Sequence, residues 1–220
     1  MTAQQRTVSL IVALVVAAFA LGAFLYQKQV RDSQMEKVAQ QDGRLVRMHS
    51  PVFGPQGAPV TLVEFFDPAC ETCRAFYPVV KDLLAKYPND LRLVIRYAPF
   101  HQGSDHVVKL LEASKRQNKY TEVLEAVLAA QPQWADHGRP DIALAFNAAK
   151  AAGLDIEQAI ADAQRPEVAA VLQQDVEDLT ALEVTRTPTF FVNGRGLPSF
   201  GREQLNALVA EEVAKARQQN

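Results

Sequence analysis

Two cysteines three residues apart, placed where an apolar run meets an amphipathic one, constrain this chain more than any other feature. Residues Val60–Phe66 read VTLVEFF, a run rich in β-branched and aromatic side chains, and Asp67-Pro68 interrupts it shortly before Cys70. The pattern predicts a buried strand, a tight turn and a helix that begins at or next to Cys70.

A helix that begins there gives the two thiols different environments. Unpaired backbone N–H groups and the positive end of the helix dipole would stabilise a thiolate at Cys70. Cys73 lies one turn further along the same side, within reach of the first sulfur but shielded from solvent. The spacing therefore predicts that Cys70 attacks and that Cys73 resolves the mixed disulfide.

Two simpler explanations for the cysteine pair are weaker. A structural zinc site needs four ligands, but the chain has two cysteines, and the nearest histidines, His49 and His101, are more than 20 residues away on either side. A purely structural disulfide across so short a loop would constrain little of the unfolded chain. Redox chemistry without a metal is the prediction that remains.

Length and charge exclude some classes of protein. The chain has 220 residues, enough for one large domain or a small domain with an insertion. Its formal net charge is −2, and no basic run interrupts the sequence, so nothing indicates nucleic acid as a partner.

The N-terminal region indicates attachment to a membrane. After a short polar tip at residues 1–7, predicted to be cytoplasmic, residues 8–26 form an uncharged apolar run that is long enough to span a bilayer as a helix. We interpret this run as a transmembrane anchor, and a removable signal peptide cleaved near Ala18–Ala20 is the alternative. Residues 27–44 read as a tether. Basic residues on both sides of the run leave the orientation undecided by charge.

The remaining sequence predicts an α/β domain that begins near Leu45 and ends near Arg217. The cysteine helix should stop by Pro88-Asn89, and a second strand over Leu91–Tyr97 should run parallel to the first, because a strand-helix-strand connection of this length is normally right-handed and parallel. Only helical patterns follow, from about residue 104 to 182. Their expected boundary signals are Ser104 as a helix cap, Pro140 as a helix start, Asp155 with Gln158 as a capping box, and Arg165-Pro166 as a break.

Strand character returns near the C-terminus. Residues 187–192 are β-prone, Asn193-Gly194 predicts a hairpin turn, and residues 197–200 are expected to pair back. Residues 201–217 are expected to form the closing helix. Pro188 suits the start of a strand, and a cis bond before it is compatible with that position.

This ordered set of features resembles the thioredoxin superfamily, and within it the DsbA-like bacterial thiol-disulfide oxidoreductases. The resemblance covers about residues 45–217 and rests on the strand followed by C-E-T-C, the segment Thr-Pro-Thr-Phe-Phe-Val-Asn-Gly, and the helical insertion between them. It implies an α/β thioredoxin fold with an inserted all-helical subdomain, here preceded by an N-terminal transmembrane helix.

The resemblance also implies roles for individual residues. The nucleophilic cysteine falls on Cys70 and the resolving cysteine on Cys73. The cis-proline that faces the active site falls on Pro188, and the backbone of Thr187 would hydrogen-bond an extended substrate peptide. The family's buried acidic residue falls on Glu64, six positions before the first cysteine.

Glu64 has a chemical rationale of its own. It lies alone in an apolar strand, where burial disfavours an ionised carboxylate and should raise its pKa toward neutrality. Such a group can exchange a proton with Cys73. The alternative is a carboxylate that faces solvent from an edge strand.

The dipeptide between the cysteines departs from the family pattern. Many strong oxidants carry Pro-His there, whereas this chain has Glu71 and Thr72, which we expect to tune the redox chemistry. A negative charge beside Cys70 should raise its pKa relative to a His-containing motif and make the pair less oxidising.

Three further polar residues are given ordinary structural roles. We interpret His101 chiefly as a surface histidine, with a weak influence on the thiolate as the alternative. His106 has no better claim to a function. Asp67 is interpreted as a turn residue and not as a catalytic one.

Together these features predict a membrane-tethered oxidoreductase that forms disulfides in exported, cysteine-containing proteins. It would need no cofactor beyond the Cys70–Cys73 disulfide, and a membrane partner, either a DsbB-like oxidase or an electron donor, would reset the pair. Disulfide exchange fits the oxidising side of a bacterial inner membrane, so the catalytic domain is expected in the periplasm or otherwise outside the cytoplasm. The alternatives are a reductase or isomerase of the same fold, and a peptide-binding chaperone or scaffold whose cysteines do not react.

Overall fold

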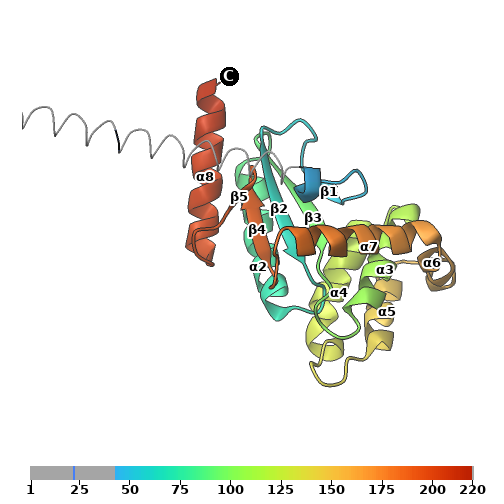
Figure 1. The fold of residues 1–220 in the computed structure, drawn as a ribbon. Coiled ribbons are helices and arrows are strands. Elements are labelled where there is room, and N and C mark those ends of the chain that lie inside the picture. The colour runs from blue at the N-terminus through green and yellow to red at the C-terminus, as the bar shows by residue number, and fades with distance from the viewer. Residues whose placement is uncertain (1–21, 23–42, 220) are drawn as a thin grey trace, which may run out of the picture. The chain divides into compact units, whose positions relative to one another are not determined.

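The computed structural model of this protein describes Gly22 and residues 43–219 (Figure 1). The predicted tip and membrane segment, Gly22 apart, and the predicted tether up to residue 42 lie outside the described residues. Within the part that is described, no helix combines the length and the apolar character needed to cross a bilayer.

A five-stranded mixed sheet forms the centre of the domain, with strand order β1-β3-β2-β4-β5. The two long strands β2 (Val60–Phe66) and β3 (Leu91–Tyr97) run parallel and occupy the positions predicted for them. The short strands β1 (Val52–Phe53), β4 (Thr189–Val192) and β5 (Arg195–Gly196) all pair antiparallel. Because β2 lies between β3 and β4, it is not an edge strand.

Helices follow the order that the sequence predicts. Helix α2 (Glu71–Lys86) connects β2 to β3, and α8 (Arg202–Gln219) closes the chain. Between β3 and β4 lies the helical insertion, which comprises α3 (Ser104–Ser114), the 3-10 turn η1 (Lys115–Gln117), α4 (Tyr120–Trp134), α5 (Ile142–Ala151), α6 (Ile156–Ala163) and α7 (Pro166–Ala181). In Figure 1 helices α3 to α6 gather beside the sheet.

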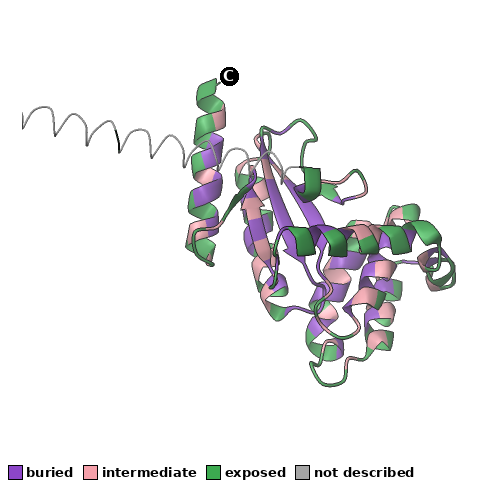
Figure 2. Cartoon of the chain, in the orientation of Figure 1, coloured by how far each residue is buried: buried purple, intermediate pink, exposed green. Residues whose placement is uncertain are grey.

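Both faces of the sheet are buried, so the central strands are almost wholly inaccessible (Figure 2). Side chains alternate along a strand, and one set, which includes Leu62 and Ile95, packs with α2, α8 and the insertion. The opposite set, which includes Val63 and Val94, packs with Leu45 and with Leu179 of α7. The alternation places Glu64 on the face that α2 covers.

A buried cluster of charges fastens α7 to the sheet. Arg96, on β3, is fully inaccessible, and its guanidinium donates to Asp175 Oδ1 at 2.8 Å and to Asp178 Oδ2 at 2.7 Å. Asp175 also accepts the backbone N–H of Tyr97 at 2.7 Å and contacts His49 Nε2 at 2.7 Å. This cluster therefore fixes the position of α7, the helix that precedes the segment carrying Pro188.

The starts of two helices differ from the sequence predictions. Gly103, with φ of +81°, caps α3, and the Ser104 hydroxyl instead donates to Asp67. Helix α5 begins at Ile142 and not at Pro140, because the Asp141 carboxylate accepts the Ala143 N–H and caps it.

The C-terminal hairpin also pairs earlier than predicted. Asn193 and Gly194 have φ of +47° and +78°, which fits a two-residue turn. Such a turn brings the very next residues, 195 and 196, opposite Val192 and Phe191, so the predicted pairing of residues 197–200 is wrong.

The buried charge cluster should be essential for stability. Asp175→Ala would leave the guanidinium of Arg96 and the N–H of Tyr97 short of acceptors in the interior, and removing one partner of a buried ion pair typically costs about 3–5 kcal/mol. We expect a loss of that size in the free energy of unfolding, measured by urea denaturation followed by circular dichroism. The matched control is Glu177→Ala on the exposed side of α7, which should change stability by less than about 0.5 kcal/mol. Equal effects of the two substitutions would contradict this account.

Candidate active site

Cys70 occupies the N-cap of α2, where the structure places it in an extended conformation with φ of −77° and ψ of 118°. Its N–H donates to Asp67 O at 3.1 Å, and its own carbonyl accepts the N–H of Arg74 at 3.1 Å. Only 5% of the residue is exposed. The helix therefore begins next to Cys70, as the sequence predicts, and its N-terminal N–H groups face the first sulfur.

The surroundings of Cys70 favour its thiolate. A hydrogen bond with the Cys73 side chain is the largest cause, and it lowers the pKa of Cys70 to about 5, although burial acts in the opposite direction. Hydrogen bonds with Thr187 and with the backbone N–H groups of Thr72 and Cys73 lower the pKa further. Because about 5 lies well below neutrality, the thiolate predominates at pH 7.

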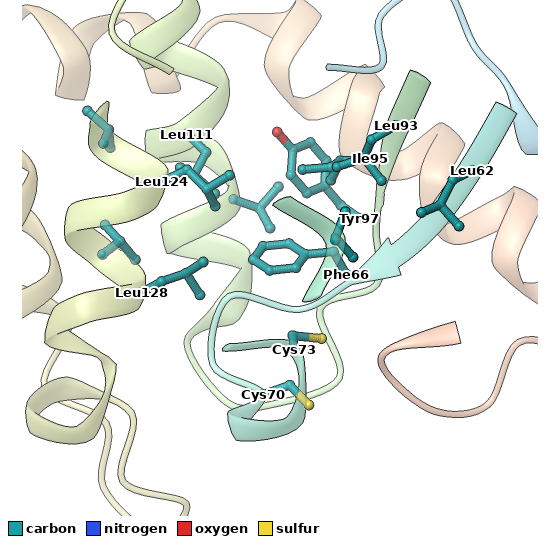
Figure 3. Close-up of a cluster of buried hydrophobic side chains, with 14 of the residues drawn as sticks. Leu62, Phe66, Cys70, Cys73, Leu93, Ile95, Tyr97, Leu111, Leu124 and Leu128 are labelled. Carbon is teal, nitrogen blue, oxygen red and sulfur yellow. The ribbon is translucent and has the colours of Figure 1, made fainter. Parts of the chain in front are cut away.

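Cys73 is in the opposite situation. It is fully buried in the first turns of α2, and burial raises its pKa well above the usual thiol value. The hydrogen bond with Cys70 and the negative charges of Glu64 and Cys70 raise it further. The two cysteines are free thiols in this structure, with Cys73 behind Cys70 at the rim of an apolar cluster that includes Phe66 and Leu128 (Figure 3).

Glu64 is a buried carboxyl group in the central strand, only 2% exposed, and its Oε1 has no hydrogen-bond partner. Burial, with a smaller contribution from the charge of Cys70, raises the pKa of Glu64 to about 8. The carboxyl is therefore protonated near neutrality. The exposed-edge alternative is wrong, because β2 is flanked by strands on both sides.

The segment before β4 supplies the remaining wall of the site. The Thr187-Pro188 peptide bond is cis, and Thr187 O lies 3.3 Å from Cys70 Sγ. Cys70 and Thr187 therefore lie side by side although 117 positions separate them in the sequence. Pro188 is buried, whereas Thr187 is partly accessible.

Asp67 and His101 are more than the turn residue and surface histidine predicted from the sequence. The Asp67 carboxylate is fully buried and contacts His101 Nδ1 at 2.8 Å. Burial lowers the pKa of His101, but the hydrogen bond and the charge of Asp67 raise it, as do the charges of Cys70 and Glu71, so that the net shift is upward. His101 is therefore a half-buried histidine whose protonated form is favoured by the site, while His106 is exposed on α3.

Glu71, the acidic residue between the cysteines, faces a histidine that the sequence analysis did not single out. His137, in the loop between α4 and α5, places Nε2 2.7 Å from Glu71 Oε1. A hydrogen bond from its own backbone N–H and this contact with His137 lower the pKa of Glu71. Thr72 acts through its backbone, as one of the N–H groups that lower the pKa of Cys70.

Gln131 of α4 is a second contributor that sequence reasoning missed. Its amide donates to Pro68 O at 2.8 Å and to Cys70 O at 3.0 Å, and its oxygen accepts from Arg74 Nε at 2.8 Å. The side chain is almost fully buried, so these bonds fix the loop that carries the motif. The only sign of this role in the sequence is that a glutamine occupies a position on the apolar face of the predicted helix.

Across residues 43–219, no three histidine, cysteine or acidic side chains come together in a geometry suited to metal binding. What the arrangement provides is a stabilised thiolate, a buried thiol behind it and a protonated carboxyl group on the adjacent strand.

Comparisons with known proteins agree with this geometry. A family model described as thioredoxin matches residues 47–216. The crystal structure of a thioredoxin-like oxidoreductase from Silicibacter pomeroyi DSS-3 is 32% identical, with a TM-score of 0.66 over 78% of this chain and 94% of that one. The thiol-disulfide exchange protein alpha-DsbA2 from Wolbachia pipientis shares the fold at 19% identity, with a TM-score of 0.68 over 82% and 96% of the two chains.

One similarity is to part of a much larger protein. A Na(+)/H(+) antiporter NhaA from Herminiimonas arsenicoxydans is 35% identical over 144 residues. That alignment covers 66% of this chain and 22% of the antiporter, so the chain spans about a quarter of the length of the curated relatives it matches.

The buried carboxyl of Glu64 should make stability depend on pH. Because the pKa of Glu64 is raised in the folded state, its favourable contribution to the free energy of unfolding is complete below about pH 4.5. That contribution is lost as the pH rises through about 8. Glu64→Gln removes this loss, and we expect the variant to be more stable than the parent by about 2–5 kcal/mol at pH 8.5, with little difference at pH 4.5. Urea denaturation of the reduced protein at both pH values measures the difference.

The control for this experiment is Glu157→Gln, which changes an exposed carboxylate on α6. Its difference from the parent protein should be the same at both pH values. A Glu64→Gln difference that does not grow with pH would show that the carboxyl is ionised in the folded protein.

Proposed function

Because the chain belongs to the thioredoxin family, we propose that it is a thiol-disulfide oxidoreductase that introduces disulfides into exported proteins through Cys70 and Cys73. The observation that carries this proposal is the asymmetry of the two thiols. The pKa of Cys70 is lowered to about 5, and the pKa of Cys73, three residues away, is raised well above the usual value.

The asymmetry suits each step of disulfide donation. A substrate thiolate attacks Cys70 Sγ, the Cys70–Cys73 bond breaks, and Cys73 leaves with the electron pair and takes up a proton. A second substrate thiolate then attacks the substrate sulfur of the mixed disulfide and expels Cys70 as a thiolate. The substrate loses two electrons and the cysteine pair gains them, and the low pKa of Cys70 makes it a good leaving group.

Glu64 is suited to supply the proton that Cys73 needs. With a pKa raised to about 8, the carboxyl is protonated near neutrality, and its charge affects the pKa of Cys73. Both groups lie on the side of β2 that α2 covers. We therefore assign Glu64 the role of proton donor to Cys73 in this direction and of acceptor in the reverse one.

Thr187 and Pro188 are assigned to substrate binding. Thr187 O lies 3.3 Å from the first sulfur, so the backbone of Thr187 is beside the point of attack. An extended peptide bound along this segment would present its own cysteine to Cys70, because main-chain hydrogen bonds hold a strand in a fixed register.

The direction of electron flow depends on how stable the thiolate is. A stabilised Cys70 thiolate favours the reduced pair and hence oxidation of substrates. The charge of Glu71 beside Cys70 favours the second candidate, a reductase or isomerase kept reduced by a membrane electron donor. The low pKa of Cys70 leads us to prefer the oxidase.

The cellular setting belongs to the same proposal. Residues 8–26 are apolar and uncharged, and we assign them the role of a membrane anchor with the catalytic domain on the oxidising side. The redox-active disulfide is itself the cofactor, and a membrane protein that accepts electrons, such as a DsbB-like oxidase, would restore it.

Substitution of the cysteines should separate the steps of exchange. Cys70→Ser should abolish disulfide exchange in an insulin-reduction assay, because the attacking and leaving sulfur is gone. Cys73→Ala should instead trap mixed disulfides with substrates, visible on a non-reducing gel and absent when Cys70 is also changed to Ser. Unchanged exchange in Cys70→Ser would refute the assignment, and peptide binding that persists without any exchange activity in the parent protein would favour a chaperone or scaffold.

The reduction potential decides between the two directions. We expect a value between about −180 and −120 mV when residues 43–220 are titrated against glutathione, because the reduced form is stabilised at Cys70. A value near about −270 mV would contradict the oxidase and identify a reductase.

A further inference from the structure

The residues on either side of Cys70 carry a charge pattern that is unfavourable for a thiolate. Asp67 precedes Cys70 by three positions and Glu71 follows it directly, and the motif itself contains no histidine. Two carboxylates this close should raise the pKa of the thiol. The pKa of Cys70 is nevertheless lowered to about 5, chiefly by its hydrogen bonds with Cys73 and Thr187, and the charge of Cys70 in turn raises the pKa of His101.

Each of these carboxylates faces a histidine from a different element. His101, in the loop after β3, contacts Asp67 Oδ2 at 2.8 Å, and its backbone N–H donates to the same oxygen at 3.0 Å. His137, in the loop after α4, contacts Glu71 at 2.7 Å. The two imidazole rings are 5.4 Å apart between centroids. We call Asp67, His101, His137 and Glu71 the acid–histidine arc.

The arc is held in place by the fold. Asp67 is fully buried and also accepts the N–H groups of Ala69 at 2.9 Å and Phe100 at 2.8 Å, so its carboxylate cannot turn away from the loop that carries His101. Gln131 joins α4 to the Cys70 carbonyl. That bond places the end of α4, and the loop that contains His137, beside the motif.

We propose that the acid–histidine arc sets the reduction potential of the Cys70–Cys73 pair and makes it depend on pH through His101 and His137. With both imidazoles protonated, each carboxylate beside Cys70 is neutralised. When an imidazole loses its proton, an uncompensated negative charge remains next to the thiolate and disfavours the reduced form. This inference rests on the proposed function of the pair.

The proton balance of the redox step shows how the effect can be measured. At pH values between the two thiol pKa values, the disulfide takes up two electrons and one proton to give a Cys70 thiolate and a Cys73 thiol. A tenfold change in proton concentration then shifts the potential by about 30 mV. If the new thiolate also draws a proton onto the arc, the slope between pH 5 and 8, where imidazoles titrate, must exceed that value.

Charged groups outside the arc also lie close to its two histidines. Cys70, at the N-cap of α2, is close enough for its charge to raise the pKa of His101. Asp136 and Arg139 flank His137 in its own loop, where Asp136 accepts the N–H groups of residues 138 and 139. Because Asp136 is occupied with its own loop, the arc carboxylates are the acceptors that the imidazoles contact.

The experiment uses glutamine substitutions, which keep a hydrogen-bond donor but cannot carry the charge. His101→Gln and His137→Gln are compared with His106→Gln, which changes an exposed histidine outside the arc. The reduction potential of each is measured against glutathione from pH 5 to 8, and the pKa of Cys70 is measured by thiolate absorbance.

The size of each effect follows from exposure. The Asp67–His101 pair has side chains 0% and 29% exposed, so His101→Gln should shift the exchange equilibrium at pH 6 by about three- to tenfold toward the disulfide, or about 15–30 mV. The side chains of Glu71 and His137 are 54% and 62% exposed, and His137→Gln should shift it by about two- to threefold. Both variants should flatten the pH profile, and His106→Gln should leave it unchanged.

A double-mutant comparison tests whether His137 acts through Glu71. In a Glu71→Gln background, His137→Gln should lose most of its effect, because no carboxylate remains to be neutralised. An equal effect in both backgrounds would overturn that part of the inference.

The inference and the proposed function fail in different ways. If the parent protein exchanges disulfides but the pH profile of its potential is the same in both histidine variants, the arc has no such role. If the Cys70→Ser protein exchanges disulfides as well as the parent, the proposed function itself is wrong.

Discussion

The active-site end of this domain depends on one buried carboxylate, that of Asp67. It accepts hydrogen bonds from the backbone N–H groups of Ala69, Phe100 and His101, from the Ser104 hydroxyl, and contacts the His101 ring. A buried carboxylate without such partners would be strongly unfavourable, so the loops after β2 and β3 must stay together. The turn that carries Cys70 is thereby held at the carboxyl ends of the two parallel strands, where α2 can begin.

Two regular features of secondary structure then divide the chemistry between the thiols. The start of α2 offers N–H groups to Cys70, and the first turn of the same helix carries Cys73 into the core, so that one pKa falls and the other rises. Side-chain alternation along β2 directs Glu64 to the side covered by that helix. A stabilised thiolate, a buried thiol and a protonated carboxyl group result from a strand, a turn and one helix.

The helical insertion contributes to the site as well as covering the sheet. Gln131 ties α4 to the carbonyl of Cys70, His137 faces Glu71, and Asp175 on α7 joins the buried Arg96 ahead of the segment that carries Pro188. Both acidic neighbours of Cys70 thus contact histidines from elements outside the motif.

Local patterns in the sequence determined the strands β2 and β3, the start of α2, the different character of Cys70 and Cys73, and the burial of Glu64, because each depends on residues within a few positions of one another. The pairing of the C-terminal hairpin and the cap of α3 were mispredicted, since a two-residue turn and a distant carboxylate decided them. Tertiary structure alone placed His101 on Asp67 and His137 on Glu71. Those partners lie 34 and 66 positions apart in the chain: the parallel pairing of β2 with β3 brings His101 to Asp67, and the packing of the insertion brings His137 to Glu71.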